Sequence, residues 1–228
     1  MYRERSAGVA GAVLWTSTAP AAAVTTRVLP DGCVDLLWSS RVGLLVAGPD
    51  RTAHLGTSAP GERWVGLRLP PGVGPAVLGV PAVRLRDQRV PLPQVWGPRV
   101  VEPLAERAER DPARVLVELA THRLRVAGGP DPLGARVAAA LAAGATVAAT
   151  AAEVGLDPRG LLRHSRNLFG YGPKTLARIL RMHRALALAR TGVSLAEVAA
   201  RSGYADQAHL TRDVRDLAGV PPTALLTG

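Results

Sequence analysis

A short stretch near the carboxyl end, RSGYADQAHLTRDVRDLAGVPP (201–222), concentrates side chains that can exchange hydrogen bonds with a partner. Asp206 stands where it can cap the first turn of a helix, because aspartate favours the N-cap position. Four polar residues follow within about two helical turns: Gln207, His209, Thr211 and Arg212. These side chains are poor core material but good readers of hydrogen-bond donors and acceptors. The chemistry that they offer is recognition of a polar surface.

The charge balance of the chain favours a polyanionic partner. Its 228 residues carry 28 basic and 18 acidic side chains, which gives a formal net charge of +10. Lys174 is the one lysine among the basic residues, and the arginine guanidinium group suits phosphates and guanine edges, although a GC-rich coding bias would also enrich arginine. Nucleic acid or an anionic membrane surface fits this charge. A membrane span is disfavoured, because no run of about 18 strongly apolar residues occurs.

The single cysteine, Cys33, limits the chemistry that the chain can perform. One cysteine forms neither an internal disulfide nor a cysteine-based zinc site, and it suits a reducing compartment, so we expect a cytoplasmic protein. His54 and His122 are too scattered to suggest a metal site. We expect no catalytic residue, no metal, no cofactor and no enzymatic activity. Cys33 is expected to pack at the start of a strand, with a redox or alkylation sensor as the alternative.

A break in composition predicts two domains. All four tryptophans lie in the first hundred residues. That half alternates short β-rich runs with proline- and glycine-containing turns, and strands are expected at 12–16, 24–29, 33–39, 43–47 and 64–69. A helix should follow near 75–80, and a helical connector should cover about 99–126. We therefore predict a β-rich domain over 1–98, a helical connector and linker over 99–130, and an all-α domain over 131–228.

The all-α part contains one small unit twice. The segment TVAATAAEVGLD (146–157) aligns with SLAEVAARSGYA (194–205) at a shift of 48 residues, which places Gly155 on Gly203. Glycine tolerates the positive φ of a tight turn, and a capping residue precedes each expected helix. Each copy therefore predicts helix, turn, helix, the plan of a DNA-reading helix-turn-helix.

The segment between the two copies is expected to hold them apart. A helix over 173–190 would be roughly 27 Å long at 1.5 Å per residue, and successive major grooves on one face of DNA lie about 34 Å apart. From residue 158 to residue 196 the chain has eight basic side chains and no acidic one. A solvated basic face is the simpler alternative to a DNA-binding surface here.

Residues 131–226 resemble the DNA-binding domain of AraC/XylS-type transcriptional regulators. The matching stretches are FGYGPKTLARILRMHRA and SLAEVAARSGYADQAHLTRDVRDLAGVPP. In the first unit, Ser165 stands where the family has a buried aromatic residue and Thr150 where it has an aliphatic one, which leaves open whether that unit reads bases. The amino-terminal part resembles small effector domains of such regulators, through LPDGCVDLLW, VAGP, GLRLPPGVGPAVLGVPA and VPLPQVWG.

The resemblance implies an α+β fold: a small β-rich domain, cupin-like and built as a barrel or sandwich, followed by an all-α domain of two helix-turn-helix units joined by a long helix. Bases are expected to be read by seven residues, since Arg suits guanine, Gln suits adenine and Leu meets a thymine methyl: Arg159, Leu162, Arg163, Gln207, His209, Thr211 and Arg212. Phosphates are expected to be held by three others: Arg166, Lys174 and Arg181.

Other residues of the same helices are expected to pack or pair within the protein. Leu210, Val214 and Leu217 should face inward, and Asp213, which opposes DNA, is expected to pair with a nearby arginine such as Arg212. His183 is expected to be a packed histidine near the apolar stripe of the long helix rather than a ligand.

These expectations describe a sequence-specific DNA-binding transcriptional regulator. Its partner is double-stranded DNA. Its amino-terminal domain would sense a small-molecule effector or mediate self-association, and RNA polymerase and a second copy of the chain remain open as partners. The alternatives are an architectural protein that binds DNA without sequence preference and an alkylation-response enzyme that depends on Cys33.

Overall fold

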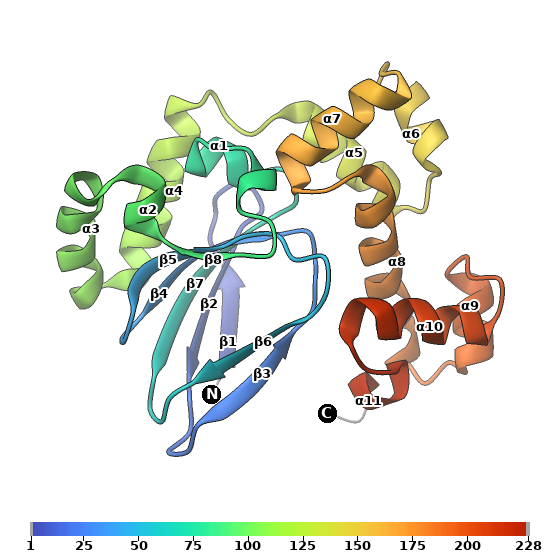
Figure 1. Cartoon of the computed structure of the whole chain (residues 1–228), viewed down its shortest axis with the longest axis horizontal. Coiled ribbons are helices and arrows are strands. Elements are labelled where there is room, and N and C mark those ends of the chain that lie inside the picture. Colours follow the sequence, from blue (N-terminus) through green and yellow to red (C-terminus); the bar gives the residue numbers. More distant parts are fainter. Residues whose placement is uncertain (1, 227–228) are drawn as a thin grey trace.

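The amino-terminal half is built on an antiparallel sheet. The structure, a computed structural model, describes residues 2–226. Six strands pair in the order β1-β2-β7-β4-β5-β8: Tyr2–Ser6, Val13–Thr18, Arg63–Leu69, Val34–Ser39, Gly43–Ala47 and Arg89–Pro91. Strands β3 (Val24–Val28) and β6 (His54–Ser58) form a separate pair, which lies on the side of the carboxyl-terminal helices (Figure 1). The expected β-rich domain is confirmed.

One face of the six-stranded sheet makes the first hydrophobic core. Along β4, Val34, Leu36 and Trp38 are at most 4% exposed and point to the same face, because side chains alternate along a strand. Two short helices add side chains to this core: α1 (Gly74–Leu78) and α2 (Leu92–Trp96). The short helix η1 (Ala82–Arg84) lies between them in the chain.

The expected connector is two helices packed on this sheet. These are α3 (Pro98–Arg110) and α4 (Pro112–Val126). The break falls at Asp111, whose side chain accepts a hydrogen bond from the backbone N–H of Arg114. Val101 and Leu116 belong to the first core, so the connector stabilises the amino-terminal domain. The division at residues 98 and 130 stays a prediction.

The carboxyl-terminal half is helical, as expected. Its helices are α5 (Pro132–Ala142), α6 (Val147–Glu153), α7 (Pro158–Phe169), α8 (Pro173–Ala189), α9 (Leu195–Arg201), α10 (Gln207–Ala218) and α11 (Pro222–Leu226). They enclose a second core around the buried stripe of α8, and α8 runs between the α6–α7 pair and the α9–α10 pair (Figure 1). Among the described residues, no helix is long and apolar enough to cross a membrane.

Gly66 on β7 lies in close contact with the side chain of Trp15 on the neighbouring strand β2. A Cβ at Gly66 would lie 2.2 Å from Cε2 of the Trp15 ring on β2. The same edge of the ring is held by a hydrogen bond, because its Nε1 donates one of 2.8 Å to Oδ1 of Asp35. The indole therefore lies flat over backbone that has room for no side chain.

We predict that Gly66→Ala lowers the free energy of unfolding by about 2–3 kcal/mol, because overpacking forces the ring away from Asp35. Gly56→Ala on β6 is the matched control, since a Cβ there meets nothing closer than His54 at 3.7 Å. Urea unfolding measures both. Equal stability of the two variants would show that the Trp15 ring moves freely.

Candidate nucleic-acid interface

Helix α7 begins at a capped residue and turns a polar face to solvent. The Asp157 carboxylate accepts a hydrogen bond of 2.7 Å from the Gly160 backbone N–H, which satisfies one free donor of the first turn. Leu161 and Phe169 are fully buried and fix the inner face. On the outer face, the three expected base-reading residues are exposed: Arg159, Leu162 and Arg163.

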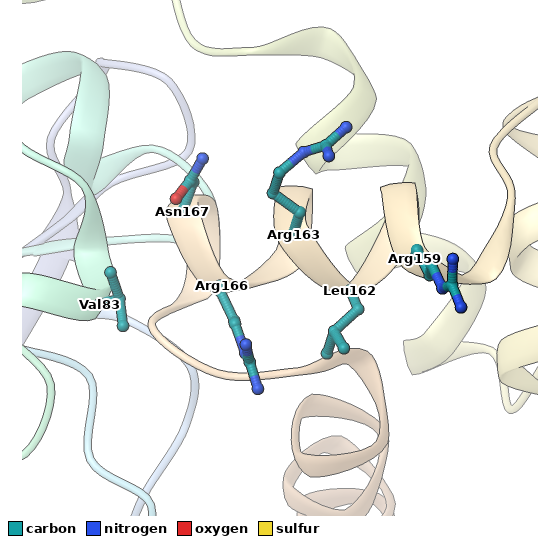
Figure 2. Close-up of a pocket in the computed structure, with 6 residues that line it drawn as sticks. All are labelled: Val83, Arg159, Leu162, Arg163, Arg166 and Asn167. Carbon is teal, nitrogen blue, oxygen red and sulfur yellow. The ribbon is translucent and has the colours of Figure 1, made fainter.

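Two further side chains share this surface. Arg166, an expected phosphate contact, is exposed, and so is Asn167, which the sequence analysis missed. Figure 2 shows Leu162 and Arg166 pointing to one side of α7, with Arg163 and Asn167 pointing to the other. Asn167 lies four residues after Arg163, so helical periodicity alone could have found it.

The two polar departures from the family pattern are both buried. Thr150 is satisfied inside α6, since its hydroxyl donates a hydrogen bond of 2.9 Å to the carbonyl oxygen of Thr146. Ser165 is fully buried, and its Oγ has no hydrogen-bond partner among the described residues. Helix α7 runs through Ser165 without interruption.

Helix α10 repeats this plan. The Asp206 carboxylate accepts a hydrogen bond of 2.6 Å from the His209 backbone N–H, and Gly203 at φ 78° makes the preceding turn, as Gly155 does at φ 70° in the first unit. Gln207 and Arg212 are exposed. The capped, glycine-containing turns expected from the repeat are confirmed.

The remaining α10 side chains divide between the surface and the core. Leu210, Val214 and Leu217 are at most 3% exposed, as expected. His209 and Thr211 are half-buried. The His209 ring packs edge-on against the buried Tyr204, with ring centroids 5.2 Å apart, so His209 also helps to position the start of the helix.

Asp213 anchors α10 on α8, which corrects the expectation that it pairs with Arg212. Its Oδ1 lies 2.7 Å from Nη2 of Arg178, and its Oδ2 lies 2.9 Å from Nη2 of Arg181. Burial alone would raise the pKa of Asp213, but hydrogen bonds and charge from Arg181 and Arg178 outweigh it and lower that pKa below its usual value. Arg212 stays free of Asp213 and exposed.

Arg181 is held at this cluster rather than extended to solvent. Its guanidinium carbon lies 4.1 Å from the centroid of the Tyr204 ring, and burial, with the charge of Asp213, raises the pKa of Tyr204 to about 12. A phosphate contact from Arg181 would compete with Asp213. Lys174, in the first turn of α8, is exposed, so its side chain is accessible for the expected phosphate contact.

The amino-terminal domain holds the last turns of both reading helices. The Arg86 guanidinium donates a hydrogen bond to the carbonyl oxygen that follows α7, at Gly170, and Arg27 donates one of 2.7 Å to the Ala218 carbonyl of α10. Positive charge at a helix carboxyl end is favourable. His183 on α8 donates from Nε2 to the Pro30 carbonyl at 2.7 Å, so the histidine expected to pack also joins the two halves.

A second group of charged residues lies half-buried in the amino-terminal domain. Nε of Arg68 lies 3.5 Å from Asp31 and 3.7 Å from Asp35. Burial raises the pKa of Asp35 to about 6, although Arg68 pulls it down. Cys33 lies just before β4, and burial, then the charges of Asp31 and Asp35, raises the pKa of its thiol well above the usual value. The described residues contain no group of three or more metal-ligating side chains.

Comparison with known proteins agrees with this geometry. Residues 150–228 match the model of a helix-turn-helix domain, and residues 12–91 match a domain of unknown function, DUF6597. No curated protein matches the chain.

Several solved structures are similar to the chain. A probable AraC family transcriptional regulator from Rhodopseudomonas palustris is 24% identical, with a TM-score of 0.38, over 42% of this chain and 96% of its own. ToxT from Vibrio cholerae with a bound unsaturated fatty acid is 11% identical, with a TM-score of 0.46, over 93% of this chain and 94% of its own. Another ToxT structure is 9% identical, with a TM-score of 0.44, over 99% of this chain and 95% of its own.

The matched segments define the class of protein. The carboxyl-terminal part of the chain, residues 150–228, is a helix-turn-helix domain of the AraC type. Its β-rich amino-terminal part belongs to a domain family whose function is unknown.

We predict that Asp213→Asn lowers the free energy of unfolding by about 2 kcal/mol, because two arginines lose their charged partner. Asp216→Asn is the control, since Asp216 lies on the same helix, 3.5 Å from Arg178, but its side chain is 70% exposed; that change should cost less than about 0.5 kcal/mol. Urea unfolding at neutral pH measures both.

The pH dependence of stability gives a second test of the ion pairs that Asp213 makes with Arg178 and Arg181. The folded-state pKa of Asp213 is depressed, so its stabilisation is present above the ordinary value of 3.8 and is lost as the pH falls through the lower folded value. The stability difference between wild type and Asp213→Asn should therefore shrink below about pH 4. A difference that stays constant down to pH 2 would contradict the ion pair.

Proposed function

We propose that the chain regulates transcription by binding double-stranded DNA sequence-specifically, with α7 and α10 in successive major grooves. The observation that supports this most is the repeated reading helix. Each copy has a carboxylate cap, a buried inner face and an exposed outer face rich in hydrogen-bonding groups. Because α8 has 17 residues, it spans roughly 25 Å and separates the two helices. Such a protein acts in the cytoplasm, where bacterial-type regulators meet DNA and RNA polymerase.

Each expected side chain has a proposed role. Arg159, Arg163, Gln207 and Arg212 are exposed and read base edges, and Leu162, which is 37% exposed, contacts a thymine methyl.

The other proposed contacts are less accessible or sequence-independent. His209 and Thr211 are half-buried and contact a base edge or a phosphate. Arg166 and Lys174 hold phosphates and fix the register. Arg181 contributes by positioning α10 through Asp213.

The amino-terminal domain is proposed to sense a small molecule or to mediate self-association. The half-buried charges of Asp35 and Arg68 support sensing, since a polar ligand could exchange with these ion pairs. The edge strand β1, all five residues of which are exposed, supports self-association. Sedimentation measurements of the oligomeric state separate the two roles. A chain that stays monomeric at all concentrations would exclude self-association and leave ligand sensing as the proposed role.

The alternative functions receive less support. An alkylation-response enzyme needs a cysteine thiolate as nucleophile, and burial raises the pKa of the Cys33 thiol instead. An architectural protein without sequence preference needs basic residues only, whereas Gln207, Leu162 and Asn167 on the reading faces suit base edges.

We predict that selection of duplexes from a random pool by the purified chain, at physiological salt, enriches a motif with two half-sites about 10 bp apart. Arg212→Ala should relax the preference at one position and weaken binding by about 1–3 kcal/mol, because a bidentate base contact is lost. Arg215→Ala, which changes an exposed arginine in the last turn of the same helix, should leave the motif unchanged.

Two results would speak against this proposal. Enrichment of no motif, with binding that only falls with salt, would support the architectural alternative. A motif that Arg212→Ala and Arg215→Ala change equally would remove Arg212 from the reading face.

A further inference from the structure

The amino-terminal domain reaches the reading face of α7. Val83 of η1 lines one surface pocket together with residues of that face, and Figure 2 shows Val83 across from the carboxyl-terminal half of α7, where Arg166 and Asn167 lie. DNA bound along α7 would therefore pass close to η1.

A hydrogen bond and close packing hold η1 against the end of α7. Arg86 donates a hydrogen bond of 3.2 Å to the Gly170 carbonyl. A Cβ at Gly170 would lie 2.6 Å from Cγ of Pro49 and 3.4 Å from the carbonyl oxygen of Ala82. These close approaches fix η1 against the end of α7, so the position of the next residues of η1 is defined relative to the reading face.

Arg84, the residue after Val83, is exposed and carries a free charge. Its arginine neighbours have acidic partners: Arg86 lies 3.6 Å from Asp87, and Arg89 lies 2.6 Å from Asp50. Among the described residues, no hydrogen bond or ion pair involves the Arg84 guanidinium. A guanidinium without a carboxylate partner remains available for a phosphate.

We propose that Arg84 binds a phosphate of the DNA backbone beside the half-site that α7 reads, so that the amino-terminal domain forms part of the DNA interface. The inference rests on the proposed function, because it needs α7 in the major groove. Arg86 acts as a positioning residue that holds η1 on α7. The contact adds affinity without sequence preference, since phosphates are the same at every base pair.

The test compares the salt dependence of binding to the enriched duplex for wild type, Arg84→Gln and Arg84→Lys. Loss of one phosphate contact should reduce the slope of log K against log salt by about 0.9 and weaken binding about five-fold near 0.15 M salt. Arg84→Lys should restore most of the slope, because it keeps the positive charge. The preferred motif should be the same for all three proteins.

Arg3→Gln is the matched control. Arg3 is also exposed, and it lies on β1, at the opposite edge of the six-stranded sheet from β8 and η1. That change should leave the slope at the wild-type value, which separates a local phosphate contact from the general loss of one positive charge. Thermal unfolding of the variants should be unchanged, because both side chains are exposed.

A second comparison locates the contact on the DNA. Shortening the duplex on the flank next to the α7 half-site should weaken binding by wild type and leave binding by Arg84→Gln unaffected, because that variant has already lost the contact to the removed phosphate. Shortening the other flank should affect both proteins equally.

The outcomes separate the two proposals. A wild-type protein that enriches no motif overturns the proposed function and this inference together. A wild-type protein that enriches the two-part motif, with Arg84→Gln indistinguishable from Arg3→Gln in slope and affinity, overturns this inference alone.

Discussion

The buried stripe of α8 is the constraint on which the carboxyl-terminal half depends. Leu176, Ile179 and Met182 are fully buried and belong to the same core as side chains from both helix-turn-helix units. Both helix-turn-helix units place side chains in the one core around α8, so each takes its orientation from α8. Because one rigid helix serves both, the two reading helices are placed relative to each other by packing rather than by a loop.

Polar contacts then set the finer position of each reading helix. In the second unit, Asp213 ties α10 to α8 through Arg178 and Arg181. In the first unit, no ion pair of the described residues ties α7 to α8, although His164 of α7 lies 3.4 Å from Asp131 at the start of α5. Ser165 leaves the buried face of α7 less tightly specified. There the amino-terminal domain supplies the missing restraint, through Arg86 and the close packing of Pro49 on Gly170. We infer that the first unit depends more on the amino-terminal domain than the second does.

Much of this arrangement could be predicted from the sequence, because it follows local rules. Capping residues, turn glycines and the 48-residue repeat fix where α6, α7, α9 and α10 begin and end, and apolar periodicity fixes their inner faces. Five strands were expected close to their observed bounds. Three strands were missed. Strand β1 shows no apolar alternation, because all its residues are exposed. Strand β6 has one aliphatic side chain and a glycine in its sequence HLGTS, and β8 has three residues.

The contacts that could not be predicted join residues far apart in the chain. The pairing of Asp213 was assigned to its neighbour Arg212, whereas the actual partners lie 35 and 32 residues away. Helical geometry explains the error: adjacent residues point in different directions, so Arg212 faces solvent while Asp213 faces α8. The hold of Arg27 and Arg86 on the reading helices depends on how the two halves dock, which no local pattern specifies.

Hydroxyl-radical footprinting of the full chain on its enriched duplex tests the central claim most directly. Two reading helices carried by one rigid helix should protect two patches of backbone on the same face of the DNA, about one helical turn apart. A single protected patch would mean that only one unit enters a groove. Uniform, weak protection along the duplex would contradict the account, because it would show that the basic surface holds phosphates without reading sequence.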